Sequence, residues 1–361
     1  MYPYFKGFIV TVTHDSNISF VALETKNDKS TPPVSQLDLN HLLEKPLAQV
    51  EHIIYDEFQH QNLPILTSVS HHIIDSGGKR IRPLLCVAMA QLSGDIVPSV
   101  LKTAAAIEFI HTATLLHDDV VDNGHTRRGK KTAHLIWGNQ ASVLVGDHMF
   151  ARAFSMLAET ENFSTIKMMS NAAKMLAEGE IIQLALKQKI PTFQDHVNVL
   201  SNKTAALFAS GCACGAILAN NTDNHAVVTQ NAYQFGFNFG ISFQLIDDIL
   251  DYQGNEALGK QIGIDFFEGK FTLPLILAYK MASDEDKKFI ETVMLRKSDR
   301  DDDDFKYIKT IFTKLDAIEH AHSVAKTYIQ KAEIYLDSFD TQNPVYTALK
   351  YMMTKTLYRK I

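Results

Sequence analysis

The chain has 361 residues, 46% of them hydrophobic and 21% charged, which is enough to bury a substantial core. Its net charge of −6 provides no basic surface for nucleic acid, which argues against a nucleic-acid partner. Its three cysteines form neither a ligand-spaced set nor an even-numbered disulfide framework, which indicates a reduced, cytoplasmic protein.

The N-terminal segment, residues 1–35, differs from the rest of the chain. It begins with the β-leaning stretch GFIVTVT and continues through the polar NDKSTPPVSQ. It has neither the cleavage site of a signal peptide nor the arginines of a transit peptide. We expect a poorly ordered N-terminal extension over 1–35 and a single all-α domain over 36–361.

Helical periodicity dominates from about residue 38 onward, and strand alternation is scarce. The turn signals are short, as in a bundle of antiparallel helices. Two charge-free windows, 204–222 and 224–246, are long enough to raise the question of a membrane span. Because polar residues and glycine interrupt both windows, we expect buried helices packed through small residues, with no transmembrane segment. The acidic run 299–304 has no apolar neighbours and predicts a solvated loop between helices.

Two aspartate clusters of the form D-D-x-x-D carry the strongest functional signal. They occupy residues 118–122 and 247–251, and each stands at the end of an apolar stretch. On a helix, the first and last aspartates of each cluster share a face, where like charges repel. A divalent cation removes that repulsion, and Mg²⁺ prefers carboxylates together with phosphate oxygens and water. A solvated helix end is the alternative, which the apolar flanks disfavour. The clusters therefore predict Mg²⁺ sites that hold one polyphosphate between them.

Basic residues occur where a phosphate ligand needs them. They are Lys79, Arg80 and Arg82 in GGKRIRP, Arg127 and Arg128 in HTRRG, Lys203 in NKTA, and Lys260 and Lys270 in the loop 259–274. The glycine pair of GGKRIRP predicts a turn that opens a helix, a setting suited to anions. A plain surface turn is the alternative for that motif taken alone.

Five motifs together resemble the trans-polyprenyl diphosphate synthases, most closely the bacterial octaprenyl diphosphate synthases. They are GGKRIRP, LLHDDVVDNGHTRRG, NKTA, FQLIDDILD and GKQIGIDFFEGKFTLP, and the resemblance covers about residues 38–361. It implies an all-α fold in which a bundle of antiparallel helices surrounds a deep central cavity, with the two aspartate motifs facing each other across its mouth. It further implies a homodimer.

The implied activity is the repeated condensation of isopentenyl diphosphate onto an allylic diphosphate. Farnesyl diphosphate is the expected primer, and the expected product is an all-trans polyprenyl diphosphate near C40 for a quinone side chain. The diphosphate leaves, the resulting allylic cation is attacked by the double bond of isopentenyl diphosphate, and a proton is lost. Such chemistry relies on electrostatic stabilisation and requires no nucleophilic serine or cysteine.

The resemblance also implies individual roles. About three Mg²⁺ ions, with Mn²⁺ as an alternative, are expected at Asp118, Asp122, Asp247 and Asp251. Asp119, Asp248 and Lys203 complete the expected catalytic set. The residues expected to hold isopentenyl diphosphate are Lys79, Arg82, His111 and Arg128. Those expected to hold the allylic diphosphate are Arg127, Lys203, Thr204, Gln244, Lys260 and Lys270.

Product length is expected to depend on residues below the first aspartate cluster. Ala113 and Thr114, about one helical turn before Asp118, leave open a position where shorter-chain relatives commonly have a bulky aromatic residue. The expected floor of the cavity is formed by Met156, Leu157 and Met169, for which ordinary core packing is the alternative.

Other functions fit the sequence less well. Glu-x-x-His pairs at 57–60, 108–111 and 319–322 are of the kind that holds a di-iron centre, but two of them lack an identifiable glutamate partner. A regulatory subunit of a heteromeric synthase usually lacks aspartates or basic pairs that this chain keeps. A terpene cyclase has a different second metal motif. A shorter-chain geranylgeranyl or hexaprenyl synthase stays open as an alternative.

Overall fold

The structure is a computed structural model, and it describes residues 8–12, 18–22, 38–59, 62–187, 189–219, 225–253, 262–296 and 300–359. Its first helices are α1 (Leu39–Leu42), α2 (Glu44–Asp56), α3 (Pro64–Ile74), α4 (Ile81–Ser93), α5 (Pro98–Val121), α6 (Ala133–Trp137), α7 (Asn139–Ala158) and α8 (Phe163–Leu186). They are followed by α9 (Phe193–Leu200), a π-helical turn η2 (Ser201–Ala205), α10 (Ala206–Ala219), α11 (His225–Gln253), α12 (Ile264–Phe267), α13 (Leu273–Met281), α14 (Asp284–Leu295), α15 (Asp302–Lys314), α16 (Ala317–Leu336) and α17 (Pro344–Leu357). The predicted all-α fold is confirmed.

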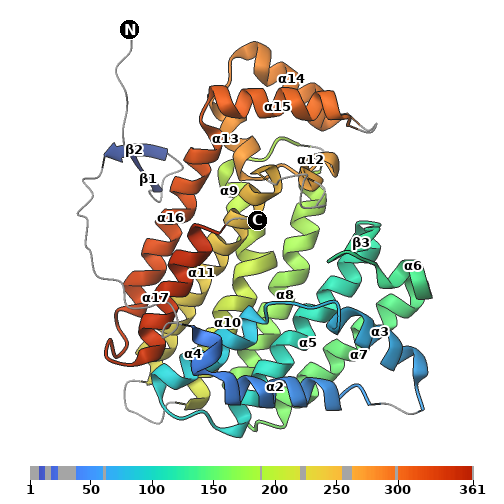
Figure 1. Ribbon diagram of the computed structural model, residues 1–361, viewed down its shortest axis with the longest axis vertical. Coiled ribbons are helices and arrows are strands. Elements are labelled where there is room, and N and C mark those ends of the chain that lie inside the picture. The colour runs from blue at the N-terminus through green and yellow to red at the C-terminus, as the bar shows by residue number, and fades with distance from the viewer. Residues whose placement is uncertain are drawn as a thin grey trace.

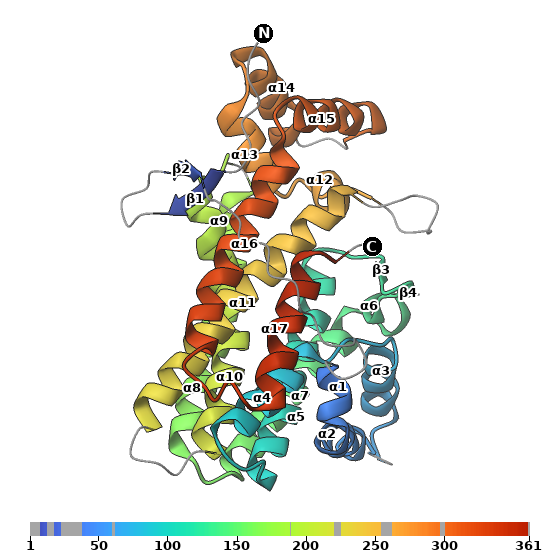
Figure 2. The same ribbon diagram turned by 60° about the vertical axis from the view of Figure 1, so that its left-hand side comes forward.

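The long helices pack lengthwise around a common core. Helices α16, α11, α10 and α8 lie side by side in that order, and α10 also packs on α4, next to α5 and α7 (Figure 1). Helices α14 and α15 project beyond one end of this bundle (Figure 1). The strands β1 (Phe8–Val12) and β2 (Ile18–Ala22) pair antiparallel and lie beside α16 (Figure 2). The strand tendency near the N-terminus is therefore confirmed, whereas the domain boundary at residue 35 stays a prediction.

Most of the described part of the charge-free windows is buried, as predicted, except at the start of α11. Helix α10 is buried along nearly its whole length, and the apolar half of α11 packs on it. No helix within the described ranges is both long and apolar enough to cross a membrane. Small residues allow the close contact: a Cβ atom added to Gly236 of α11 would lie 2.6 Å from the carbonyl oxygen of Phe208.

Replacing Gly215 of α10 by Ala is expected to destabilise the protein by about 2–3 kcal/mol, because the new Cβ would lie 2.1 Å from the backbone carbonyl oxygen of Cys86 in α4. An exposed helical Gly→Ala change has the opposite sign, stabilising by roughly 0.5–1 kcal/mol. Urea denaturation measures the difference. Gly211→Ala is the matched control, because its new Cβ would meet only the flexible end of Ile107 at 3.2 Å. Equal stability of both variants would contradict the packing argument.

The acidic run corrects one prediction. Asp301 caps the N-terminus of α15 through a reciprocal capping box with Asp304, and the aspartates between them form the first helical turn. Asp304 is nearly buried and accepts a hydrogen bond from Arg296 at 2.7 Å. Most of the run is therefore a helix start, which acidic side chains favour because of the helix dipole.

A short hairpin follows the first aspartate cluster. The two-residue strands β3 (Thr126–Arg127) and β4 (Lys130–Lys131) pair antiparallel. Arg128 and Gly129 between them both have positive φ, 52° and 78°, as a type I′ turn requires. This turn holds the adjacent arginines of the motif in a defined conformation.

Candidate active site

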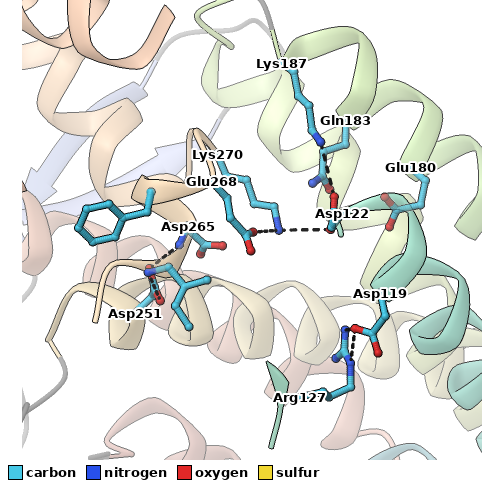
Figure 3. Close-up of polar contacts among 12 residues, drawn as sticks. Asp119, Asp122, Arg127, Glu180, Gln183, Lys187, Asp251, Asp265, Glu268 and Lys270 are labelled. Carbon is cyan, nitrogen blue, oxygen red and sulfur yellow. Dashed lines mark hydrogen bonds and ion pairs between the residues drawn. The ribbon is translucent and has the colours of Figure 1, made fainter. Parts of the chain in front are cut away.

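The first aspartate cluster lies at the C-terminal end of α5. Asp118 is in the last turn, and Asp122 is the residue that caps it. Burial raises the pKa of the Asp118 carboxyl to about 6, although the positive charge of Lys203 opposes this rise. Burial acts in the same direction on Asp122, but nearby lysines outweigh it and lower the pKa of that carboxyl. Lys270 and Lys187 approach the two oxygens of Asp122 at 3.6 and 3.5 Å (Figure 3).

Asp119, between these two residues, points elsewhere. Its carboxylate is only 4% exposed, and its Oδ1 accepts bonds from Nε and Nη2 of Arg127 at 2.8 and 2.7 Å (Figure 3). The hairpin that follows α5 therefore folds back onto the cluster. Arg127 was expected at the allylic diphosphate, and here it neutralises Asp119.

The second aspartate cluster lies near the C-terminal end of α11. Asp247 pairs with Arg359, which follows α17 at the far end of the chain. The carboxylate of Asp251 accepts the backbone N–H groups of Ile264 and Asp265 at 3.1 and 3.0 Å, at the start of α12. Burial raises the pKa of Asp251 to about 6. It raises the pKa of Asp265 to about 8, helped by the charges of the neighbouring aspartates.

This donor set fits divalent cations that share their coordination with a ligand. Buried carboxylates whose pKa values are raised lack sufficient positive charge around them, and a hard cation such as Mg²⁺ would supply it. Among the described residues, no three acidic, histidine or cysteine side chains converge closely enough to hold a metal ion by themselves. Phosphate oxygens and water would complete the coordination, as is usual for Mg²⁺.

A cavity of about 160 Å³ is lined by Asp248 of the second cluster and by Lys187 and Lys270, which both approach Asp122 of the first. Its wall includes Lys203 and Thr204 from η2, Gln244 from α11 and Lys270 from the loop before α13. These are four of the six residues expected to hold the allylic diphosphate. Of the other two, Arg127 pairs with Asp119 and Lys260 lies outside the described residues. The structure thus brings three distant stretches of sequence to one cationic cavity.

The residues expected to hold isopentenyl diphosphate gather at the GGKRIRP turn. Nη1 of Arg82 donates to Nε2 of His111 at 3.2 Å, since a guanidinium has no acceptor. Burial and then the positive charge of Arg82 lower the pKa of His111 well below its usual range, so the ring is neutral. The guanidinium of Arg128 lies over Gly78, where a Cβ atom would be 2.8 Å from it. Burial raises the pKa of Asp247, and the positive charges of Arg359 and, to a smaller extent, of Lys79 oppose this rise.

Arg80 has a structural part in this turn. It adopts a left-handed backbone conformation with φ 45° and bonds Glu51 at 2.9 Å and Glu108 at 2.8 Å. Because Arg80 engages Glu108, the Glu-x-x-His pair at 108–111 does not form half of a di-iron site. The same contacts hold the chain so that α4 begins at Ile81, as the glycine turn predicted.

Comparison with known proteins agrees with this geometry. A family model described as polyprenyl synthetase matches residues 63–312. The chain belongs to the polyprenyl synthetase family. The resemblance is thereby confirmed, and the protein is an enzyme, a prenyltransferase.

Three relatives illustrate the similarity. The synthetase is 40% identical over 258 residues to octaprenyl diphosphate synthase of Escherichia coli (strain K12), covering 71% of this chain and 79% of that protein. It is 39% identical over 261 residues to the geranyl-diphosphate-specific all-trans-nonaprenyl-diphosphate synthase of Rhodobacter capsulatus, covering 70% of this chain and 79% of that protein. It superposes with a TM-score of 0.85 and 38% identity on the polyprenyl synthase of Caulobacter crescentus CB15, solved with calcium and isoprenyl diphosphate, over 92% of this chain and 100% of that one.

Sequence reasoning missed the contribution of α8 to the site of this synthetase. Glu180 forms an ion pair with Lys203, and Gln183 accepts a hydrogen bond from Lys203 at 3.1 Å. Figure 3 shows Glu180, Gln183 and Lys187 on one helix. A Cβ atom at Gly179 would lie 2.7 Å from the backbone nitrogen of Lys203, so this glycine allows α8 to approach η2. Polar residues at 180, 183 and 187 recur at helical spacing, which was the available signal.

Four of the five residues expected to set product length lie in the largest core cluster. Ala113 is fully buried in α5, and Met156, Leu157 and Met169 belong to the same cluster. Thr114 is partly exposed, and its hydroxyl donates to the carbonyl of His111 at 2.7 Å. The hydroxyl of Ser142 in α7 bonds the carbonyl of Leu116, which places Met156 roughly 21 Å farther along α7. Their role in product length stays a prediction.

Proposed function

We propose that this polyprenyl synthetase condenses isopentenyl diphosphate repeatedly onto farnesyl diphosphate and releases an all-trans polyprenyl diphosphate of octaprenyl length for a quinone side chain. The cavity that brings Lys203, Thr204, Gln244 and Lys270 together carries this proposal. Its cations lie directly beside Asp122, one of the residues expected to hold metal. The octaprenyl product is favoured by the 40% identity to the synthase of that name.

The reaction begins with loss of the diphosphate from the allylic substrate. Lys203 and Lys270 would hold the departing pyrophosphate, because both ammonium groups line the cavity. The C–O bond breaks with both electrons on oxygen, and the allylic carbon becomes cationic. The double bond of isopentenyl diphosphate, held by Arg82 and Lys79, then attacks that carbon. A proton leaves to the released pyrophosphate, and the chain is five carbons longer.

Magnesium is the metal that suits this site. We assign Asp118, Asp122, Asp247 and Asp251 as its ligands, with about three ions per active site and Mn²⁺ as a substitute. When bound, the metal neutralises charge on the diphosphate leaving group. Lys270 and Lys187 contact Asp122, and Arg359 contacts Asp247, so basic side chains lie beside both groups of proposed ligands.

Incubating the purified protein with farnesyl diphosphate, labelled isopentenyl diphosphate and Mg²⁺ tests the proposal. Mass spectrometry is expected to show octaprenyl diphosphate, and chelation of the metal is expected to stop the reaction. Product limited to geranylgeranyl or hexaprenyl diphosphate would support a shorter-chain synthase instead. Absence of any polyprenyl product from the pure chain would reject the main proposal and favour a subunit of a heteromeric synthase.

We also propose a homodimer. Large apolar side chains are exposed on α6 and α7, where Leu135 and Ile136 are each 46% exposed and Leu144 is 66% exposed. The family resemblance favours a second copy of the chain as the partner that binds this surface. Light scattering is expected to give twice the chain mass of 40.5 kDa. A mass equal to one chain at micromolar concentration would contradict the proposal.

A further inference from the structure

A chain of hydrogen bonds runs from α9 along the wall of the cationic cavity, which all four of its residues line. Nε2 of His196 in α9 lies 3.0 Å from Oδ2 of Asp248. Nε2 of Gln244, one turn earlier in α11, lies 3.1 Å from Oδ1 of the same carboxylate. The hydroxyl of Thr204 in η2 lies 3.2 Å from Oε1 of Gln244. His196, Asp248 and Thr204 are only 6%, 3% and 5% exposed, so water competes little for these bonds.

The direction of each bond follows from the chemistry of the groups. A carboxylate only accepts, so His196 and the amide nitrogen of Gln244 both donate to Asp248. The amide oxygen of Gln244 only accepts, so the Thr204 hydroxyl donates to it. The amide of Gln244 is thereby fixed in one of its two orientations. One N–H of Gln244 is then left, and because Gln244 lines the cavity, that N–H is available to an anion there.

We propose that His196 is a positioning residue: by holding Asp248, it orients the Gln244 amide so that it donates to the allylic diphosphate. This inference rests on the proposed function and adds a residue to it. Asp248 would accordingly act through its contacts with the side chains of His196 and Gln244. Within the second cluster, this assigns Asp248 to positioning of the Gln244 amide.

A hydrogen-bond donor at position 196 is needed because other carboxylates surround that of Asp248. Burial raises the pKa values of Asp247, Asp251 and Asp265, and the negative charge of Asp248 adds to each rise. Without the His196 donor, one oxygen of Asp248 would be buried without its partner, which costs free energy. Rotation of Asp248 would relieve that cost but would release the amide of Gln244, which could then present its oxygen to the diphosphate.

Two substitutions separate positioning from packing. His196→Leu removes the donor at similar volume, whereas His196→Gln keeps an N–H with similar reach. Calorimetry with inorganic pyrophosphate and Mg²⁺ is expected to show that His196→Leu raises the Kd about tenfold. Loss of one hydrogen bond to a charged group has about this effect on affinity. The KM for farnesyl diphosphate should rise in parallel, and the KM for isopentenyl diphosphate should not change. In His196→Gln, the Kd for pyrophosphate and the KM for farnesyl diphosphate should both lie within about threefold of the wild-type values.

Asn198→Ala is the matched control, because Asn198 is an exposed residue of the same helix. It should bind pyrophosphate as the wild-type protein does. Wild-type affinity in His196→Leu, or equal weakening in His196→Leu and His196→Gln, would overturn the positioning role. Should His196→Leu not fold, His196→Asn replaces it, since its shorter side chain does not reach Asp248. Pyrophosphate binding requires no turnover, so a wild-type protein that binds it but makes no polyprenyl product would reject the proposed function alone.

Discussion

Asp118→Asn is expected to lower kcat by at least about 10³-fold, because a metal ligand that stabilises several kcal/mol of transition-state charge is lost. The carboxylate lies in the last turn of α5, where burial raises its pKa to about 6. Asn has nearly the same shape but is a neutral and weaker ligand. Initial rates of labelled isopentenyl diphosphate incorporation at saturating substrate measure the loss. Excess Mg²⁺ should recover only a small part of it.

The same substitution should not weaken the fold. A carboxyl whose folded pKa exceeds its unfolded value costs stability once pH rises above the unfolded value, near 3.9, and the full cost is reached above the folded pKa. Removing that charge should therefore leave the free energy of unfolding of the metal-free protein at pH 7.5 equal or higher. Asp303→Asn is the control, because that side chain is 91% exposed in α15. An Asp118→Asn enzyme within tenfold of wild-type activity would contradict the assignment of Asp118 as a ligand.

Local patterns in the sequence were sufficient to predict most of the helices. Apolar spacing indicated the bundle, and small residues such as Gly215 and Gly236 indicated its close-packed centre. The β3–β4 hairpin was missed because its strands are only two residues long, too short for an alternating pattern. The π-helical turn at Ser201–Ala205 was also missed, since it differs from an α-helix only in hydrogen-bond register.

The site was predictable where it is local. The first and last aspartates of each cluster lie one turn apart on a single helix, so their spacing alone indicated that they share a face of the helix. Contacts between distant segments left no such pattern. Arg359 reaches Asp247 from across 112 residues, and Lys187 reaches Asp122 from across 65. These contacts depend on how α17 packs against α11 and on where the end of α8 lies relative to the end of α5, which no spacing in the sequence encodes.

The middle aspartate of each cluster is the clearest example of this difference. Asp119 and Asp248 are both buried, and each is held by a basic or histidine side chain from another element, Arg127 and His196. The sequence presents three similar carboxylates per cluster, whereas the structure buries the middle one and leaves the two outer ones partly exposed. Under the proposed function, the outer aspartates of the D-D-x-x-D motif would bind metal, while the buried middle one holds a side chain of another element.

Ala113→Tyr is expected to shorten the product from octaprenyl length to about C20 or below. Ala113 is fully buried in α5, roughly 8 Å along the helix axis from Asp118, so a phenol ring there would occupy space that a chain growing away from the first cluster needs. Mass spectrometry of products made from farnesyl and isopentenyl diphosphate measures the distribution. Overpacking is expected to cost about 1–3 kcal/mol, so thermal unfolding should accompany the assay.

Two companion variants test which residue of α5 limits product length. Ala113→Ser adds little volume and should leave product length unchanged. Thr114 lies closer than Ala113 to the direction of Asp118 around the helix, because four residues turn through about 40° and five through about 140° beyond a full turn. Thr114→Tyr should therefore shorten the product at least as much if the chain runs along the Asp118 face. If a folded Ala113→Tyr enzyme still makes octaprenyl diphosphate and the Thr114→Tyr enzyme does not, Thr114 rather than Ala113 limits product length. If both variants make full-length product, the growing chain lies on another face of α5.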